Sequence, residues 1–443
     1  MKKLITKKIM VLTGMVAVFA LATPAFAQTS DSLIDKLVQK GVLTVQEGNE
    51  LRKQSQDDFG KGFDKAYRSQ TGMPDWVSKL KFNGDFRARY DRIWQDTSPV
   101  ASADRDRFRY RLRFGATWAL SDNFEVGMRL GSGEVGSAAP SLGGSPFSAN
   151  TTMNNDGSRK FIFVDLAYAK WKPTPNLFFE VGKMPGEFWF TDMVFDPDYN
   201  PEGAQERLVV PVNKKHSIGF TAGQFVIAEN FNSSTTNVNS DVYVFFEQVD
   251  WQAKWTERLS SRLAVGMMNF ANQSSIPTSM ETFINQNGSP AVGAGAQDFN
   301  PIIVRGEVTY NFDSFPGFHG KFPVTLGVEF ADNPGAKGLD CTDAQAWNVG
   351  LGLGSSKEKG NWQLNYNYKE IGTAAVWHGL NDDDFGYGAK GGSNVRGHQV
   401  ILAYHAAAPL IVSLRYMHGE RIINAPGTSA EQDRLFFDLL WSF

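Results

Sequence analysis

The segment from Arg107 to Leu120 alternates between polar and apolar residues without a break. Arginines fall on one face of this segment, and aromatic or aliphatic residues fall on the other. This is the period of a β-strand whose two faces meet different surroundings. An arginine in contact with lipid costs about 2–4 kcal/mol at the bilayer midplane, and four of them would cost as much as the whole stability of many domains. We therefore expect the arginine face to meet water and the opposite face to meet lipid.

The same period recurs along most of the chain, in about sixteen segments. Every second connection is short, such as 121–123, 173–176 and 256–259, whereas 132–159, 271–300 and 374–395 are long and rich in Gly, Ser, Asn and Asp. This pattern is typical of transmembrane barrels, which leave no open sheet edge in hydrocarbon. We predict an all-β transmembrane fold over residues 77–443, an antiparallel β-barrel of about 16 strands.

The N-terminal part differs from this pattern. Residues 1–27 combine four lysines, an apolar run and an Ala25-Phe26-Ala27 motif, which predicts a secretory signal peptide. Residues 28–76 have helical spacing and a capping box at 44–47, which predicts a short periplasmic α-helical hairpin. This segment would be a spacer or a small oligomerisation or cell-wall contact module. No apolar run of about 18 residues follows the signal, so no transmembrane helix is expected.

Other motifs do not support catalysis or a cofactor. Gly131–Gly136 matches GxGxxG, but no helix follows it. The six histidines are scattered, no GxSxG motif occurs, and Cys341 is the only cysteine. With a net charge of -3 and no basic block, no nucleic-acid partner is expected. We expect no enzyme, cofactor or metal. We interpret Asp382-Asp383-Asp384 as a solvated charge run in an outer loop, with a divalent-ion site as the alternative.

The end of the chain carries a more specific pattern, in which apolar residues alternate up to a terminal phenylalanine: Phe437, Leu439, Trp441 and Phe443. This strand resembles the assembly signal of bacterial outer-membrane barrels, which implies recognition by the barrel assembly machinery. Together with the helical lead at 33–44, the barrel pattern and the stretch from Asp196 to Gly203, it resembles the putative porin family of Gram-negative bacteria. The resemblance implies passive transport in the outer membrane, in contact with lipid and lipopolysaccharide and often as a homotrimer.

The resemblance also implies that the loop after the fifth strand folds into the lumen. That loop is rich in carboxylates: Glu187, Asp192, Asp196, Asp198 and Glu202. We expect it to narrow the pore opposite basic residues of the first three strands: Arg87, Arg89, Arg107, Arg109, Arg111, Arg113 and Arg129. Opposed charges of this kind sort polar solutes. The basic side favours a weak anion preference. The alternative is an ordinary solvated surface loop.

These observations predict an exported, integral outer-membrane protein with a water-filled channel for passive diffusion of small hydrophilic solutes. A substrate-specific channel for anions such as phosphate, or for sugars, is an alternative. The sugar channel stays open because Phe161, Phe163 and Trp171 share a nominally inward face. A structural or adhesion barrel with a plugged lumen is a further alternative. An outer-membrane enzyme is disfavoured by the missing catalytic set.

Overall fold

The computed structural model describes residues 77, 79–98, 104–135, 143–154, 156–230, 240–276, 298–336, 341–386, 392–424 and 427–443. The chain divides into two compact units, residues 1–78 and 79–443, and the description below concerns the second. The predicted signal peptide and helical hairpin lie outside the described residues. No helix in the described ranges is long and apolar enough to cross a membrane.

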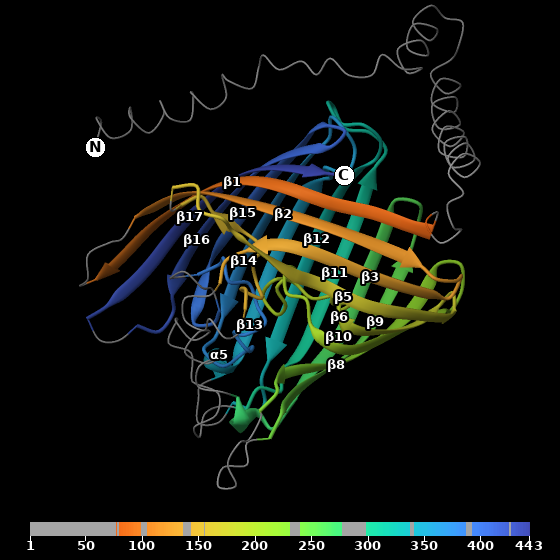
Figure 1. The fold of residues 1–443 in the computed structure, drawn as a ribbon, viewed down its shortest axis with the longest axis horizontal. Helices are drawn as coiled ribbons and strands as arrows, with labels where there is room; N and C mark the ends of the chain where they lie inside the picture. The colour runs from red at the N-terminus through yellow and green to blue at the C-terminus, as the bar shows by residue number, and fades with distance from the viewer. Residues whose placement is uncertain are drawn as a thin grey trace, which may run out of the picture. The chain divides into compact units, whose positions relative to one another are not determined.

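The second unit is one antiparallel sheet (Figure 1). Sixteen main strands follow one another around it: β1 (Leu80–Ser98), β2 (Arg105–Ala119), β3 (Phe124–Gly133), β5 (Phe161–Thr174), β6 (Leu177–Lys183), β7 (Glu202–Pro211), β8 (His216–Ala228), β9 (Val242–Lys254), β10 (Leu259–Ala271), β11 (Ile302–Phe312), β12 (Phe322–Asp332), β13 (Gln345–Gly354), β14 (Trp362–Ile371), β15 (Val395–Ala407), β16 (Leu410–Arg421) and β17 (Ser429–Ser442). β1 pairs with both β2 and β17, so the sheet closes into a barrel. The predicted sixteen-stranded barrel is confirmed.

Three short elements complete the described secondary structure. β4 (Thr151–Thr152) pairs with β2 beyond the end of its pairing with β3. A single 3₁₀ turn, η4 (Gln273–Ser275), follows β10, and a single helical turn, α5 (Cys341–Ala344), precedes β13.

The two faces of the barrel wall differ as the alternation predicts. Along β2, Phe108 and Leu112 are 45 % and 43 % exposed, whereas Arg109 and Arg111 are 7 % and 5 % exposed. Large apolar side chains are exposed on most other strands too, and aromatic rings pair across neighbouring strands, as Phe82 does with Phe114. The apolar face is therefore the outer face, and the arginines point inward.

One register shift overturns an expectation for β5. Its pairing with β3 passes over Asp165, between the partners of Arg129 and Leu130, which changes the phase of the alternation. Phe163 consequently lines an inner cavity, whereas Trp171 is exposed on the outer face, stacked on rings of β3 and β6. The expected common inward face of these aromatic residues is therefore wrong.

Two long connections fold into the barrel. We call residues 184–201, between β6 and β7, inner loop A, and residues 372–386, after β14, inner loop B. Loop A contacts inward-facing residues of strands as distant as β2, β9, β12 and β14. Side chains of both loops join inner-wall residues in one apolar cluster that includes Met193, Phe195, Phe225, Phe246, Trp377, Leu380, Phe385 and Phe436. The core of the molecule therefore lies inside the barrel.

Candidate functional site

Strands β1 and β2 place arginines directly opposite one another on the inner face. Arg87 pairs with Arg111, and Arg89 pairs with Arg109. Like charges in such positions repel each other, so they need carboxylates nearby. Asp85 of β1 is one such carboxylate. It accepts hydrogen bonds from Arg111 at 2.9 Å and from the neighbouring Arg113 at 2.7 Å.

Two further carboxylates beside these arginines are more deeply buried than Asp85. Asp438 on β17 accepts two hydrogen bonds from Arg89, at 2.7 and 2.8 Å. Asp91 is fully buried and lies within 2.6 Å of Arg107 and 3.2 Å of Arg434. These contacts bring six of the seven predicted basic residues together with Arg434, which the sequence analysis missed. The missed residue lies on the last strand, and only barrel closure brings it to β1.

The seventh predicted arginine lies apart from this group. Arg129 on β3 pairs with Asp165 of β5 at 2.5 Å. We call the other residues the arginine wall: Arg87, Arg89, Arg107, Arg109, Arg111, Arg113 and Arg434. Among the described residues, five carboxylates lie within 4 Å of these seven arginines: Asp85, Asp91, Asp198, Asp384 and Asp438. The seven arginines and these five carboxylates together therefore carry a net charge of two positive units.

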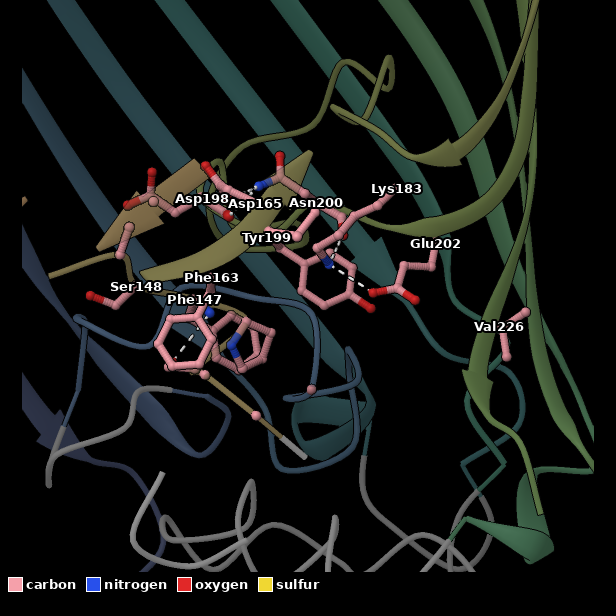
Figure 2. Close-up of a pocket in the computed structure, with 18 of the residues that line it drawn as sticks. Phe147, Ser148, Phe163, Asp165, Lys183, Asp198, Tyr199, Asn200, Glu202 and Val226 are labelled. Carbon is pink, nitrogen blue, oxygen red and sulfur yellow. Dashed lines mark hydrogen bonds and ion pairs between the residues drawn. The ribbon is translucent and has the colours of Figure 1, made fainter. Parts of the chain in front are cut away.

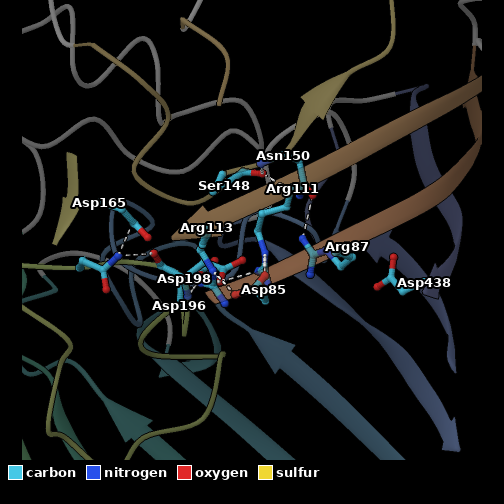
Figure 3. A network of polar contacts seen from close by, with 12 residues as sticks. Asp85, Arg87, Arg111, Arg113, Ser148, Asn150, Asp165, Asp196, Asp198 and Asp438 are labelled. Atoms are coloured by element: carbon cyan, nitrogen blue, oxygen red, sulfur yellow. Dashed lines mark hydrogen bonds and ion pairs between the residues drawn. The ribbon is translucent and has the colours of Figure 1, made fainter. Parts of the chain in front are cut away.

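Inner loop A brings one of its predicted carboxylates to this wall. Asp198 lies 3.4 Å from Arg111 and 3.7 Å from Arg113 (Figure 3). The predicted opposition of loop carboxylates and arginines is therefore met by a single residue in the described part of the chain.

The other four predicted carboxylates have different surroundings. Asp192 pairs with Lys369 of β14 at 2.6 Å, and Glu187 lies 3.4 Å from Lys170 of β5. Glu202 is the first residue of β7 and pairs with Lys183 at 2.9 Å. Asp196 faces inner loop B. The prediction of one acidic surface facing the arginines is thus replaced by a loop whose carboxylates hold it to several strands.

Backbone groups of loop A are held by side chains of the far wall. The Trp189 N–H donates to Gln248 of β9 at 2.8 Å, and the Thr191 N–H donates to Glu329 of β12 at 2.9 Å. The Trp189 ring contacts two guanidinium groups and lies 4.2 Å from that of Arg262 and 4.0 Å from that of Arg305. These contacts span the lumen and fix the loop across it.

Inner loop B folds into the barrel beside inner loop A, which sequence reasoning missed. Its backbone bonds to loop A, with the Asp196 N–H donating to the Leu380 carbonyl at 2.7 Å and the Asp382 N–H to the Asp192 carbonyl at 2.9 Å. The interpretation of Asp382–Asp384 as a solvated charge run is wrong. The apolar run 374–377 was the available signal, because a solvated loop would expose these apolar side chains to water.

Three carboxylates meet where the two loops touch. Oxygen atoms of Asp196, Asp382 and Asp383 lie within 4.8 Å of one another. Burial raises the pKa of Asp382 to about 6. Burial, followed by repulsion from neighbouring carboxylates, holds the pKa values of Asp196 and Asp383 well above the ordinary range. Protonation of these groups would reduce the repulsion between the loops.

A cavity of about 540 Å³ lies beside the arginine wall (Figure 2). Rings of Phe147, Phe163 and Tyr199 line it together with Arg113, Lys183, Asp165 and Asp198. Because Arg113 of the arginine wall and Asp198 of inner loop A both line this cavity, a small polar solute in it would contact the opposed charges directly.

The end of β17 closes the barrel. The Phe443 N–H donates to the Gly84 carbonyl at 3.0 Å, and the Phe443 carbonyl accepts from the Gly84 N–H at 2.8 Å. A side chain at Gly84 would meet the Phe443 ring at 2.6 Å, so the ring packs on bare backbone. The other residues of the predicted assembly signal, Phe437, Leu439 and Trp441, lie on β17 and pair with β1. Their recognition during assembly stays a prediction.

Comparisons with known proteins complete these observations. Among solved structures, the chain is similar to the outer membrane channel DcaP of Acinetobacter baumannii, with 13 % identity over 82 % of this chain and 97 % of that chain and a TM-score of 0.44. It is similar to OprB of Pseudomonas putida at high pH, with 9 % identity over 85 % and 97 % and a TM-score of 0.48. It is also similar to Salmonella typhi OmpF in complex with daunomycin, with 11 % identity over 84 % and 100 % and a TM-score of 0.44.

No curated protein sequence matches the chain. A family model described as Putative porin matches residues 94–300 and 321–443, which is most of the chain and nearly all of the barrel. The closed barrel, its apolar outer face and its charged inner wall agree with that match, and the chain belongs to the Putative porin family.

Proposed function

We propose that this protein is an outer-membrane channel through which small hydrophilic solutes diffuse passively, with a weak preference for anions. The observation that carries the proposal is the arginine wall with Asp198 of inner loop A opposite it. A closed barrel of sixteen strands is wide enough for an aqueous channel. Charges of opposite sign across such a channel orient a polar solute and select its charge.

The direction of selectivity follows from the charge balance of the wall. Its two excess positive charges attract anions and repel cations, and the low-dielectric barrel wall strengthens both effects. The preference stays weak because five carboxylates offset most of the arginine charge. No catalytic role is proposed for any of these residues.

The proposed surroundings follow from the barrel. The apolar outer face would contact outer-membrane lipid, and the long loops would contact lipopolysaccharide. A homotrimer, export through the periplasm after removal of residues 1–27, and recognition of Phe443 by the barrel assembly machinery are parts of the same proposal.

A barrel with a plugged lumen is the second candidate. The specific observation in its favour is the apolar cluster that joins loops A and B inside the barrel, including the fully buried Met193, Phe246 and Phe436. A structural or adhesion protein could use such a cluster to seal its lumen.

Conductance separates the two candidates. Purified full-length protein in a planar bilayer should give stepwise currents that increase with salt concentration, and its reversal potential in a salt gradient should indicate an excess of anion flow. A folded barrel that gives no current would overturn the channel and support the plugged barrel.

A further inference from the structure

Inner loop B places the carboxylate of Asp384 among the residues of the arginine wall. This carboxylate lies 3.0 Å from Arg434 and 3.7 Å from Arg89. The Asp384 carbonyl also accepts a hydrogen bond from Arg434 at 3.3 Å. Asp384 belongs to inner loop B, which follows β14, whereas these arginines are on β1 and β17. The loop therefore delivers a carboxylate to arginines of distant strands.

A third arginine of this group has donors to spare. Arg109 lies opposite Arg89 in the β1–β2 pair and is more than nine-tenths buried. Its Nε has no hydrogen-bond partner among the described residues, and the nearest carboxylate oxygen, of Asp91, is 3.9 Å away. Although burial opposes ionisation, Arg434, Arg89, Arg415 and Arg109 together lower the pKa of Asp384. Arg109 therefore lies opposite Arg89, which contacts Asp384, and has an Nε donor that no described residue uses.

The wall's own strands supply too few counter-charges for these arginines. Asp85, Asp91 and Asp438 are part of β1 and β17, whereas Asp198 and Asp384 come from the inner loops. Of the two carboxylates near Arg89, the side chain of Asp384 is 21 % exposed and that of Asp438 is 11 % exposed. Of the two carboxylates near Arg89, Asp384 is therefore the one that a solute can more readily replace.

We propose that Arg89, Arg109 and Arg434 form a binding subsite for the carboxylate group of an organic solute, and that Asp384 fills this subsite until a solute carboxylate replaces it. Guanidinium forks match the planar, two-oxygen geometry of a carboxylate. The replacement needs only a rotation of the Asp384 side chain, because the Leu380 carbonyl and the Asp382 N–H bond loop B to loop A independently. The inference rests on the proposed channel function and names a substrate class for it.

The test compares Asp384→Asn with Asp383→Asn in planar bilayers, with acetate as the probe. Asp384→Asn removes the internal counter-charge. It should raise the chloride-to-potassium permeability ratio by about threefold, the combined effect on the anion and on the cation of one unit charge at roughly 12 Å in a water-like dielectric. Acetate should then block chloride current at a lower concentration than in the unmodified protein. Asp383→Asn is the matched control, because it makes the same substitution at the neighbouring position of inner loop B and, among the described residues, no arginine of the wall lies within 4 Å of the Asp383 carboxylate.

Equal acetate block in the unmodified protein and both variants would overturn the subsite, and so would inorganic phosphate blocking Asp384→Asn as strongly as acetate. Arg109→Gln in the unmodified background is a second route that leaves Asp384 in place, and it should weaken the block. If the unmodified protein gives no current, the channel proposal fails. Calorimetric titration of detergent-solubilised Asp384→Asn with acetate then decides the subsite separately, because heat of binding supports it and no heat overturns it.

Discussion

At the scale of single residues, Asp250 shows how the inner wall tolerates buried charge. It is fully buried on β9 and pairs with Arg207 at 2.8 Å and with Arg262 at 3.0 Å. One carboxylate here compensates the charges of two arginines, so both arginines depend on Asp250. Loss of one partner from a buried ion pair leaves an uncompensated charge, which is far more costly than loss of an exposed pair.

Asp250→Asn should therefore destabilise the barrel by about 3–5 kcal/mol. The measurement is the free energy of unfolding in denaturant, in detergent micelles. Asp313→Asn is the control. Asp313 forms an exposed pair with Arg258 at a short turn, so this variant should leave the free energy of unfolding nearly unchanged. Equal stability of the two variants would show that the Asp250 cluster is hydrated rather than buried.

The paired arginines of β2 test selectivity at the same scale. Replacement of Arg109 and Arg111 together by glutamate changes the wall by four charges and should reverse the anion preference, with a permeability ratio shifted by about tenfold or more. Reversal potentials in a salt gradient measure this ratio. Arg258→Glu alters charge at an exposed turn and should leave the ratio unchanged. An unchanged ratio in the double variant would remove these arginines from the solute path.

At the scale of elements, inner loop A depends on two acceptors of the far wall. Alanine at Gln248 and Glu329 removes the partners of the Trp189 and Thr191 N–H groups, at roughly 1 kcal/mol for each lost hydrogen bond. The loosened loop should give a larger and noisier single-channel conductance. Thr325→Ala is the control, because Thr325 lies on the same inner wall and bonds to Thr309 of the neighbouring strand. Identical current traces would contradict a constricting role for loop A.

The junction of loops A and B should strengthen in mild acid. Ionised Asp382 opposes docking because burial raises its pKa from 3.8 to about 6. This penalty is complete above pH 6 and is relieved as the pH falls from about 6 towards 3.8. Exchange of the Asp196 amide hydrogen, which bonds to Leu380, should be slower at acid pH after correction for the intrinsic rate. Asp382→Asn should weaken this dependence, and faster corrected exchange in acid would contradict the assignment.

The strands were predictable and the inner loops were only partly so, for a physical reason. Alternation is a local property of each strand, and it was sufficient to predict sixteen of them. The position of loop A in the lumen depends on partners far along the chain, such as Glu329, which is 138 residues from Thr191. A local pattern carries no information about such contacts. The same limit hid Asp384 and Arg434, which barrel closure and loop insertion bring together.

At the scale of the whole molecule, the outer face must be apolar all around the barrel. Val265, in the middle of β10, is 49 % exposed and pairs with valines on both neighbouring strands. Val265→Arg should cost about 2–4 kcal/mol, the cost of a cation at the bilayer midplane. Thr309→Arg on the inner face should cost much less. Unfolding from lipid bilayers measures both, and equal costs would contradict the assignment of the two faces.

The most direct test of the central claim asks which face of β2 meets water. In a Cys341→Ser background, Arg113→Cys and Phe114→Cys place neighbouring thiols on opposite faces of one strand. During current recording, a negatively charged, membrane-impermeant methanethiosulfonate should modify the Arg113→Cys channel and change its conductance, and should leave Phe114→Cys unaffected. Reaction at Phe114→Cys with none at Arg113→Cys would place the arginine face in lipid and contradict the channel.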